Sequence, residues 1–259
     1  MILVIDVGNT NTVVGVLLEG KVVERWRIST ISRTTDELGL LLLQLLKHRS
    51  LLVEQFQGVA VSCVVPSVLY AIEKAAKRYF NLTALVVSKG VRTGMRVRTD
   101  NPREVGADRI VNAVAAFERY KQAVIVVDFG TATTLDCVSS KGDYIGGAIA
   151  PGFRISAEAL FSKTAKLPKV EVEQTEKVIG TNTIQSMQAG LYWGYVGLVE
   201  ELAKRCKAEM RESEGSTSSV HCVATGGLSH LIGRSCSEID SIDGDLTLYG
   251  LWLLFQRNR

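Results

Sequence analysis

The sequence predicts an α/β protein made of two similar halves. Runs rich in Val and Ile, typical of buried strands, alternate with segments of helical period along the 259-residue chain. A short pattern also occurs twice, as VIDVGNTNTV at 4–13 and VVDFGTATTL at 126–135, with an aspartate followed two residues later by a glycine. The aspartates lie 128 − 6 = 122 residues apart, each at the start of an α/β half, which indicates a duplicated domain. We therefore expect two domains, at 1–115 and 116–259.

Alternating strand and helix patterns account for the first half. Val- and Ile-rich runs predict strands at 2–6, 12–18, 21–28 and 58–65, and helical periodicity predicts helices at 36–48 and 67–79. The first helix has clear ends, because Thr34 and Glu37 have the spacing of a capping box and basic residues at 47–49 occupy its last turn. Its apolar run at 38–46 is far shorter than the ~20 residues that span a bilayer, so we expect a core helix.

A further strand and a loop lead into the second half. The run TALVVS predicts a strand at 83–88, and a helix follows the DNP of 100–102 and continues to about Tyr120. Next come a strand, turn and strand over 123–138, a small-residue strand and turn over 146–153, a helix over 183–210, and a strand with a Gly226-Gly227 turn within 221–232.

Three of these features have two interpretations each. The glycines of 146–153 serve either close approach to a nucleotide or the packing of two helices. The apolar stripe of the helix at 183–210 is either core or a dimer contact. The Gly226-Gly227 turn is either a tight connection or a place where an adenosine lies against the backbone.

Charge, cysteine and histidine content argue against several classes of protein. Lys and Arg number 30 against 27 Asp and Glu and are scattered, so no nucleic-acid partner is expected. The five cysteines form no C-x-x-C pair, which favours small buried side chains in a reducing cytoplasm. The three histidines do not have zinc-ligand spacing. The first residues lack a basic n-region, so we expect a soluble, cytoplasmic protein with no signal peptide and no membrane partner.

The repeated turn itself has two interpretations. Asp, Gly and Asn are ordinary hairpin formers, so one copy alone is best explained as a tight turn. The pair favours a phosphate site, because glycine allows close approach and backbone N–H groups with Thr or Asn side chains donate to phosphate oxygens. An aspartate at the strand end can hold a hydrated Mg²⁺ that bridges phosphates. The chain has no G-x-x-x-x-G-K-[ST], no G-x-G-x-x-G and no serine-hydrolase elbow, which excludes those alternatives.

An acidic and a basic residue stand together at the start of the helix between the two turns. In isolation, Asp108 is best explained as a helix cap and Arg109 as the partner of an acid. Between two phosphate turns they also match a phosphotransferase, which needs a carboxylate to accept a hydroxyl proton and a cation to orient an anionic substrate. The residues alone therefore predict a two-lobed phosphotransferase.

Seven stretches together resemble the type III pantothenate kinases, members of the actin, sugar kinase and Hsp70 ATPase superfamily. They run in order along the chain: IDVGNTNT (5–12), DNPREVGADR (100–109), DFGTATT (128–134), GGAIAPG (146–152), KLPKV (166–170), GTNTIQSMQ (180–188) and ATGGL (224–228). The resemblance implies duplicated ribonuclease H-like (actin-like ATPase) domains with an interdomain nucleotide cleft. It also implies ATP-dependent phosphorylation of pantothenate to 4'-phosphopantothenate, the first step of coenzyme A biosynthesis.

The same resemblance implies roles for individual residues. ATP would be bound by Asp6, Val7, Gly8, Asn9, Thr10, Asn11, Thr12, Val13 and Thr131. Pantothenate would be bound by Gly106, Ala107, Asp108, Arg109 and Thr183, with Asp108 as the general base and Thr183 acting across a homodimer interface. Asp128 would coordinate a monovalent cation, K⁺ or NH₄⁺, beside the Mg²⁺ that accompanies ATP.

One position departs from the family pattern. Thr99 stands just before the DNP stretch, where the family commonly has a tyrosine that contacts the substrate. The threonine keeps a hydroxyl but loses the ring, so we expect a backbone contact or weaker binding of pantothenate.

Two other activities fit the same fold. One is a regulatory protein that binds nucleotide and acts through a partner, although such a protein does not need the base Asp108. The other is a phosphatase, or a kinase for another small hydroxylated acid. Turnover of ATP that depends on added pantothenate distinguishes the predicted kinase from a phosphatase.

Overall fold

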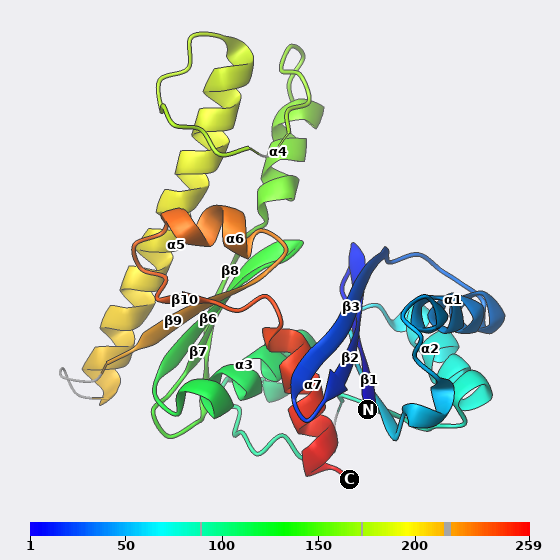
Figure 1. Ribbon diagram of the computed structural model, residues 1–259. Coiled ribbons are helices and arrows are strands. Elements are labelled where there is room, and N and C mark those ends of the chain that lie inside the picture. Colours follow the sequence, from blue (N-terminus) through cyan, green and yellow to red (C-terminus); the bar gives the residue numbers. More distant parts are fainter. Residues whose placement is uncertain (89, 172, 215–218) are drawn as a thin grey trace. The chain divides into compact units, whose positions relative to one another are not determined.

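The structure of the protein is a computed structural model that describes residues 1–88, 90–171, 173–214 and 219–259 (Figure 1). The chain forms two compact units. Unit 1 contains Met1–Gly94, Asn101–Ala115 and Asp245–Arg259, and unit 2 contains Met95–Asp100 and Ala116–Gly244. The units thus differ from the predicted division at 1–115 and 116–259 in two short segments, and the domain boundary stays a prediction.

Unit 1 is built on a five-stranded sheet in the order β3-β2-β1-β4-β5. Its strands are β1 (Ile2–Val7), β2 (Asn11–Leu18), β3 (Lys21–Ser29), β4 (Gly58–Cys63) and β5 (Ala84–Val86). The first three are antiparallel neighbours, whereas β4 is parallel to both β1 and β5. Helices α1 (Thr35–His48) and α2 (Pro66–Phe80) cover one face and α7 (Leu246–Arg257) covers the other (Figure 1).

The core of unit 1 follows from the alternation of side chains along its strands. Leu3, Ile5 and Val7 point to the face covered by α1 and α2. The opposite face meets α7, because a Cβ on Gly58 would lie 1.9 Å from the ring of Phe255. The predicted capping box at the start of α1 is confirmed, with Thr34 and Glu37 bonded to each other's backbone N–H.

Unit 2 is built on a second five-stranded sheet, in the order β10-β9-β6-β7-β8. Its strands are β6 (Val124–Phe129), β7 (Ala132–Val138), β8 (Tyr144–Pro151), β9 (His221–Gly226) and β10 (Ser241–Ile242). The long helix α5 (Thr183–Glu214) and the short α6 (Ser229–Ile232) pack on one face, and α4 (Phe153–Ser162) contacts α5. In Figure 1, α4 and the first part of α5 extend beyond the edge of this sheet.

The two sheets have the same strand order and the same strand directions. In each, a strand that ends in an aspartate and one further residue pairs antiparallel with the next strand and parallel with a later one. Asp6 stands opposite Val13 and Ser62, and Asp128 stands opposite Thr134 and Thr225. The predicted duplication is therefore present in strand order and direction, although the second turn brings Asp128 opposite a residue six positions later, against seven for Asp6. The α/β fold class is confirmed.

Two elements differ from the predictions. The helix after the DNP stretch, α3, spans Ala107–Tyr120 and begins later than predicted, because Asn101 caps a separate 3-10 helix at Pro102–Glu104. Helix α7 has no counterpart among the predicted elements. Across the described residues, no helix has both the length and the apolar character needed to cross a bilayer.

Candidate active site

The first predicted phosphate turn is the short connection between β1 and β2. The N–H of Gly8 donates to the carbonyl oxygen of Asn11 at 3.0 Å and closes the turn, which leaves Asn9 and Thr10 exposed. Asp6 is the last residue but one of β1 and is half-buried. The turn therefore presents a backbone loop at the end of a buried strand that carries a carboxylate.

The end of β3 supports this turn through a residue that the sequence did not single out. Thr30 follows the last residue of β3, and its N–H donates to the carbonyl oxygen of Thr10 at 3.0 Å. Its hydroxyl donates to the carbonyl oxygen of Gly8 at 2.8 Å and also contacts the hydroxyl of Thr12 at 2.9 Å. The sequence carries no signal for these contacts beyond a threonine at the end of a strand.

A neighbouring thiol shows the local electrostatics of this strand end. Burial raises the pKa of the Cys63 thiol, a backbone hydrogen bond at Val65 partly offsets this rise, and the negative charge of Asp6 adds a smaller increase. Cys63 therefore stays neutral. Its neighbour Ser62, which stands opposite Asp6 in the strand register, is fully buried.

The second turn connects β6 and β7 and carries Asp128 and Thr131. Gly226, at the end of β9, has a left-handed backbone with φ +89°, and a Cβ there would lie 2.4 Å from Oδ1 of Asp128. The Asp128 carboxylate is thus held against a position that only glycine can occupy without displacing it. The N–H of Gly227 also donates to the carbonyl oxygen of Phe129 at 3.1 Å.

Glycines of the 146–153 stretch press against the same region. A Cβ on Gly152 would lie 2.0 Å from the carbonyl oxygen of Thr131, and one on Gly147 would lie 1.8 Å from that of Leu135. The sequence left open whether these glycines approach a nucleotide or let helices pack. Their contacts are with the backbone of the second turn and of β7, so they fix the shape of the turn.

The predicted general base, Asp108, and the basic residue beside it, Arg109, lie in the first turn of α3. Oδ1 of Asp108 accepts a hydrogen bond from the N–H of Arg109 at 2.8 Å, and a Cβ on Gly106 would lie 2.5 Å from this oxygen. The carboxylate therefore folds over Gly106, which must lack a side chain. This bond leaves Oδ2 as a second acceptor, and both Asp108 and Arg109 are only half-buried.

Helix α7 holds the start of α3 in place. The hydroxyl of Thr247 donates to Oδ1 of the buried Asn112 at 2.7 Å. One turn of α7 further on, a Cβ on Gly250 would lie 2.4 Å from the carbonyl oxygen of Val111. The helix missing from the sequence predictions thus positions the candidate catalytic residues.

Thr183 is the first residue of α5 and is exposed. Oδ1 of Asn182 accepts from the N–H of Gln185 at 2.9 Å, which caps the helix. A groove of about 570 Å³ lies here, lined by Leu160, Leu167, Gly180, Thr181, Asn182, Thr183, Ser186, Met187, Gly190 and Leu191. Next to the groove, Val178, Ile179 and Ile184 expose 63%, 85% and 50% of their surface.

Thr99 lies in unit 2, just after a segment that adds to the edge of β8. There the N–H of Arg98 donates to the carbonyl oxygen of Tyr144 at 2.8 Å. The hydroxyl oxygen of Thr99 is buried, and it has no hydrogen-bond partner within the ranges that the structure describes. The hydroxyl that stands in place of the family tyrosine is thus enclosed by protein.

The donor chemistry at the strand ends fits Mg²⁺ delivered with a nucleotide. Asp6 and Asp128 supply carboxylate oxygens, the type of ligand that Mg²⁺ prefers. Over residues 1–88, 90–171, 173–214 and 219–259, no cluster of three or more His, Cys, Asp or Glu side chains forms a ready-made metal site. One or two carboxylates with substrate phosphates are the usual setting for Mg²⁺, so the residues present fit the ion.

Structural comparison defines the class of protein first. A protein described as a Baf family transcriptional activator from Campylobacter jejuni has 16% identity and a TM-score of 0.59, over 99% of this chain and 98% of its own. Component A of (R)-2-hydroxyglutaryl-CoA dehydratase from Acidaminococcus fermentans has 13% identity and a TM-score of 0.53, with 99% and 98% covered. The fold is that of the actin-like ATPases and sugar kinases.

Sequence comparison then defines the family. The family model for type III pantothenate kinase matches residues 2–205. Type III pantothenate kinases from Geobacter sulfurreducens and Syntrophobacter fumaroxidans are 49% and 51% identical to this chain, over 100% of it and 100% and 99% of their own lengths. That of Bacillus cytotoxicus is 47% identical, over 100% and 97%. The chain belongs to the type III pantothenate kinase family.

This membership confirms the predicted enzyme class and reaction. The protein is a kinase that phosphorylates pantothenate in coenzyme A biosynthesis, with ATP as the phosphoryl donor. The roles of the individual residues, the monovalent cation and the dimer rest on further argument.

Proposed function

We propose that the turns after β1 and β6 bind the phosphates of ATP and that Asp108 activates the hydroxyl of pantothenate. The observation that carries this proposal is the equivalence of Asp6 and Asp128, each the last residue but one of the central strand in two sheets of the same topology. A hairpin needs no such match, whereas a nucleotide held by two copies of one phosphate turn does.

Residues 6–13 form the first phosphate site, in which the exposed Asn9 and Thr10 offer their side chains to the phosphates, and Thr131 supplies its hydroxyl from the second turn. Asp6 would hold the Mg²⁺ that accompanies ATP, and the ion would supply positive charge to the phosphates. Asp128 holds the monovalent cation, K⁺ or NH₄⁺, and its closeness to Gly226 supports this role because the carboxylate is fixed in one position. The predicted interdomain cleft remains part of this proposal.

Asp108 accepts the proton of the primary hydroxyl of pantothenate through Oδ2 while Oδ1 stays bonded to the N–H of Arg109. The bond fixes the direction of the carboxylate, so the base is already oriented before substrate arrives. Arg109 pairs with the pantothenate carboxylate, and Gly106 and Ala107 allow the substrate to approach the backbone. At Thr99, where the family has a tyrosine, pantothenate makes a backbone contact or binds more weakly, since the threonine hydroxyl is buried.

A homodimer completes the substrate site through Thr183. The exposed apolar side chains of Val178, Ile179 and Ile184 beside the groove support an interface there. Thr183 lines this groove, which supports the proposal that it reaches pantothenate across the interface between two copies. All five cysteines are free thiols, which supports a cytoplasmic location.

The test of the base assignment is Asp108→Asn, which keeps the acceptor for the Arg109 N–H but removes the base. We expect turnover to fall by roughly 10² to 10⁴-fold with the Kd for ATP unchanged. Asp36→Asn is a matched control, since Asp36 also lies in the first turn of a helix and is exposed. Near-wild-type turnover of Asp108→Asn would leave Asp108 as a helix cap only.

A further inference from the structure

Thr30 forms hydrogen bonds to two backbone carbonyls of the first phosphate turn. These bonds determine which hydrogen-bond donors of the turn are left to bind a ligand. Each threonine hydroxyl has a single proton. The hydroxyl of Thr30 gives its proton to the carbonyl oxygen of Gly8, so in its 2.9 Å contact with Thr12 the donor must be Thr12. The bonds therefore run in one direction, from Thr12 to Thr30 to Gly8.

This direction changes the role of Thr12. Thr12 is only 7% exposed and gives its single proton to Thr30. It cannot donate the same proton to a phosphate oxygen. Thr12 thus supports the turn, although the sequence places it among the ATP-binding residues.

The bonds from Thr30 also orient two backbone N–H groups. Every peptide bond of the described chain is trans, so each C=O points opposite to the N–H of the following residue. Thr30 draws the carbonyls of Gly8 and Thr10 toward itself, through its hydroxyl and its N–H. The N–H groups of Asn9 and Asn11 therefore point away from Thr30.

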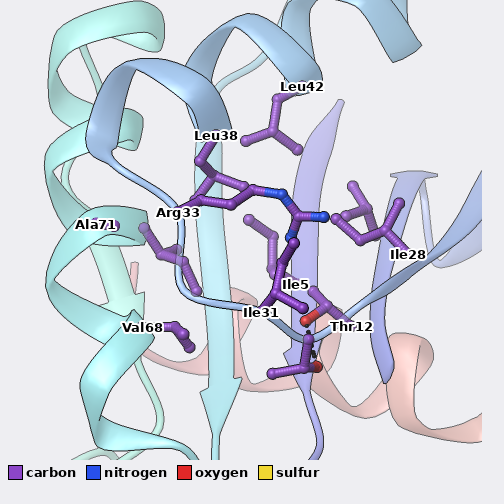
Figure 2. Close-up of a pocket in the computed structure, with 12 residues that line it drawn as sticks. Ile5, Thr12, Ile28, Ile31, Arg33, Leu38, Leu42, Val68 and Ala71 are labelled. Carbon is purple, nitrogen blue, oxygen red and sulfur yellow. Dashed lines mark hydrogen bonds between the residues drawn. The ribbon is translucent and has the colours of Figure 1, made fainter. Parts of the chain in front are cut away.

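The surroundings strengthen these bonds. Thr12 and Thr30 line a small pocket whose other walls are mostly apolar, including Ile28 and Leu38, and Figure 2 shows the hydrogen bond of Thr12 beside these side chains. Hydrogen bonds in such surroundings are stronger than bonds exposed to water. Valine has nearly the shape of threonine, so Thr30→Val and Thr12→Val remove the hydroxyl with little change in side-chain volume.

We propose that Thr30 is a positioning residue of this kinase: it fixes the phosphate turn so that the N–H groups of Asn9 and Asn11 face the phosphates of ATP. This inference rests on the proposed phosphate-binding role of the turn. It assigns no chemical step to Thr30, which acts through the backbone of residues 8–11 alone.

The experiment measures the Kd of ATP, ADP and adenosine by calorimetry for Thr30→Val, Thr30→Ser and Thr12→Val. Thr30→Val loses two hydrogen bonds and should weaken ATP and ADP by about 10- to 100-fold while adenosine binding stays unchanged. Thr12→Val loses one and should show a smaller effect in the same direction. Thr30→Ser keeps the hydroxyl and should bind ATP within about threefold of wild type.

Controls separate this role from a general loss of structure. Tyr79→Phe removes a hydroxyl bonded to Asp36 on the surface of α1 and α2 and should change none of the three constants. Equal weakening of ATP and adenosine in Thr30→Val, or ATP binding as in wild type, would overturn the inference. If Thr30→Val does not fold, Thr12→Val decides on the same criteria. Failure of the wild-type protein to bind ATP would overturn both this inference and the proposed function.

Discussion

The position of Asp128 depends on a glycine at the end of β9, 226 − 128 = 98 residues later in the chain, and Gly226→Ala tests that dependence. A Cβ at this position would lie 2.4 Å from Oδ1 of Asp128 and 2.7 Å from both N and O of Phe129. The φ of +89° is itself unfavourable for alanine. The backbone strain costs about 1 to 2 kcal/mol and the overlap about 1 to 3 kcal/mol.

The expected loss of stability is therefore about 2 to 4 kcal/mol, relieved in part by movement of the Asp128 carboxylate. For a chain of this size each kcal/mol lowers Tm by about 2 to 4 °C, so Tm should fall by roughly 5 to 15 °C. The displaced carboxylate should also raise the K⁺ concentration needed for half-maximal activity by about tenfold or more, the equivalent of 1.4 kcal/mol.

Thermal unfolding followed by circular dichroism measures the first effect, and initial rates over a K⁺ titration measure the second. Gly194→Ala is the matched control, because Gly194 is exposed in the interior of α5 and a Cβ there meets nothing within 4 Å. That change should raise stability by about 0.5 to 1 kcal/mol. A Gly226→Ala protein with wild-type Tm and wild-type K⁺ dependence would refute the reasoning.

Four further outcomes are expected. Arg109→Ala should raise the KM for pantothenate by about tenfold or more with little change in that for ATP, and an unchanged KM would make Arg109 structural. Leu251→Ala, in the buried face of α7, should cost about 2 to 5 kcal/mol in urea unfolding, against little change if α7 docks loosely. Iodoacetamide should label Cys206 before Cys222. A hydrogen bond from Cys137 lowers the pKa of the Cys206 thiol, whereas burial raises the pKa of the Cys222 thiol to about 12. Labelling of Cys222 first would contradict this prediction. Ile179→Asp should shift the protein from dimer to monomer in light scattering, and an unchanged dimer would place the interface elsewhere.

The repeated strand and turn made most of the architecture predictable. Strand signals in both halves are long runs of Val and Ile, and the aligned Asp6 and Asp128 indicated that the second half copies the first. The observed strand order and strand directions bear out that inference, with the second turn one residue shorter than the first. Local signals such as the Thr34 capping box were equally reliable, since both partners lie within four residues of one another.

Features that depend on distant contacts were not predictable. Helix α7 packs on the sheet face where Gly58 leaves room for the ring of Phe255, a contact that only the folded chain shows. Its hydrogen bond to Asn112 of α3 joins residues 135 apart in the chain. The later start of α3 arises because the Asn101 side chain stabilises a separate turn first. Thr30 likewise gains its meaning only from strand pairing, which places it beside a turn twenty-two residues earlier.

The central claim is that this chain phosphorylates pantothenate with ATP and that Asp128 serves a monovalent cation in that reaction. Mass spectrometry of the product after incubation with MgATP and pantothenate, with KCl present or replaced by NaCl, tests it most directly. The account predicts phosphopantothenate in the presence of K⁺ and loss of that product without it. ATP binding without phosphopantothenate under any salt would contradict the account, and equal product in both salts would remove the cation role from Asp128.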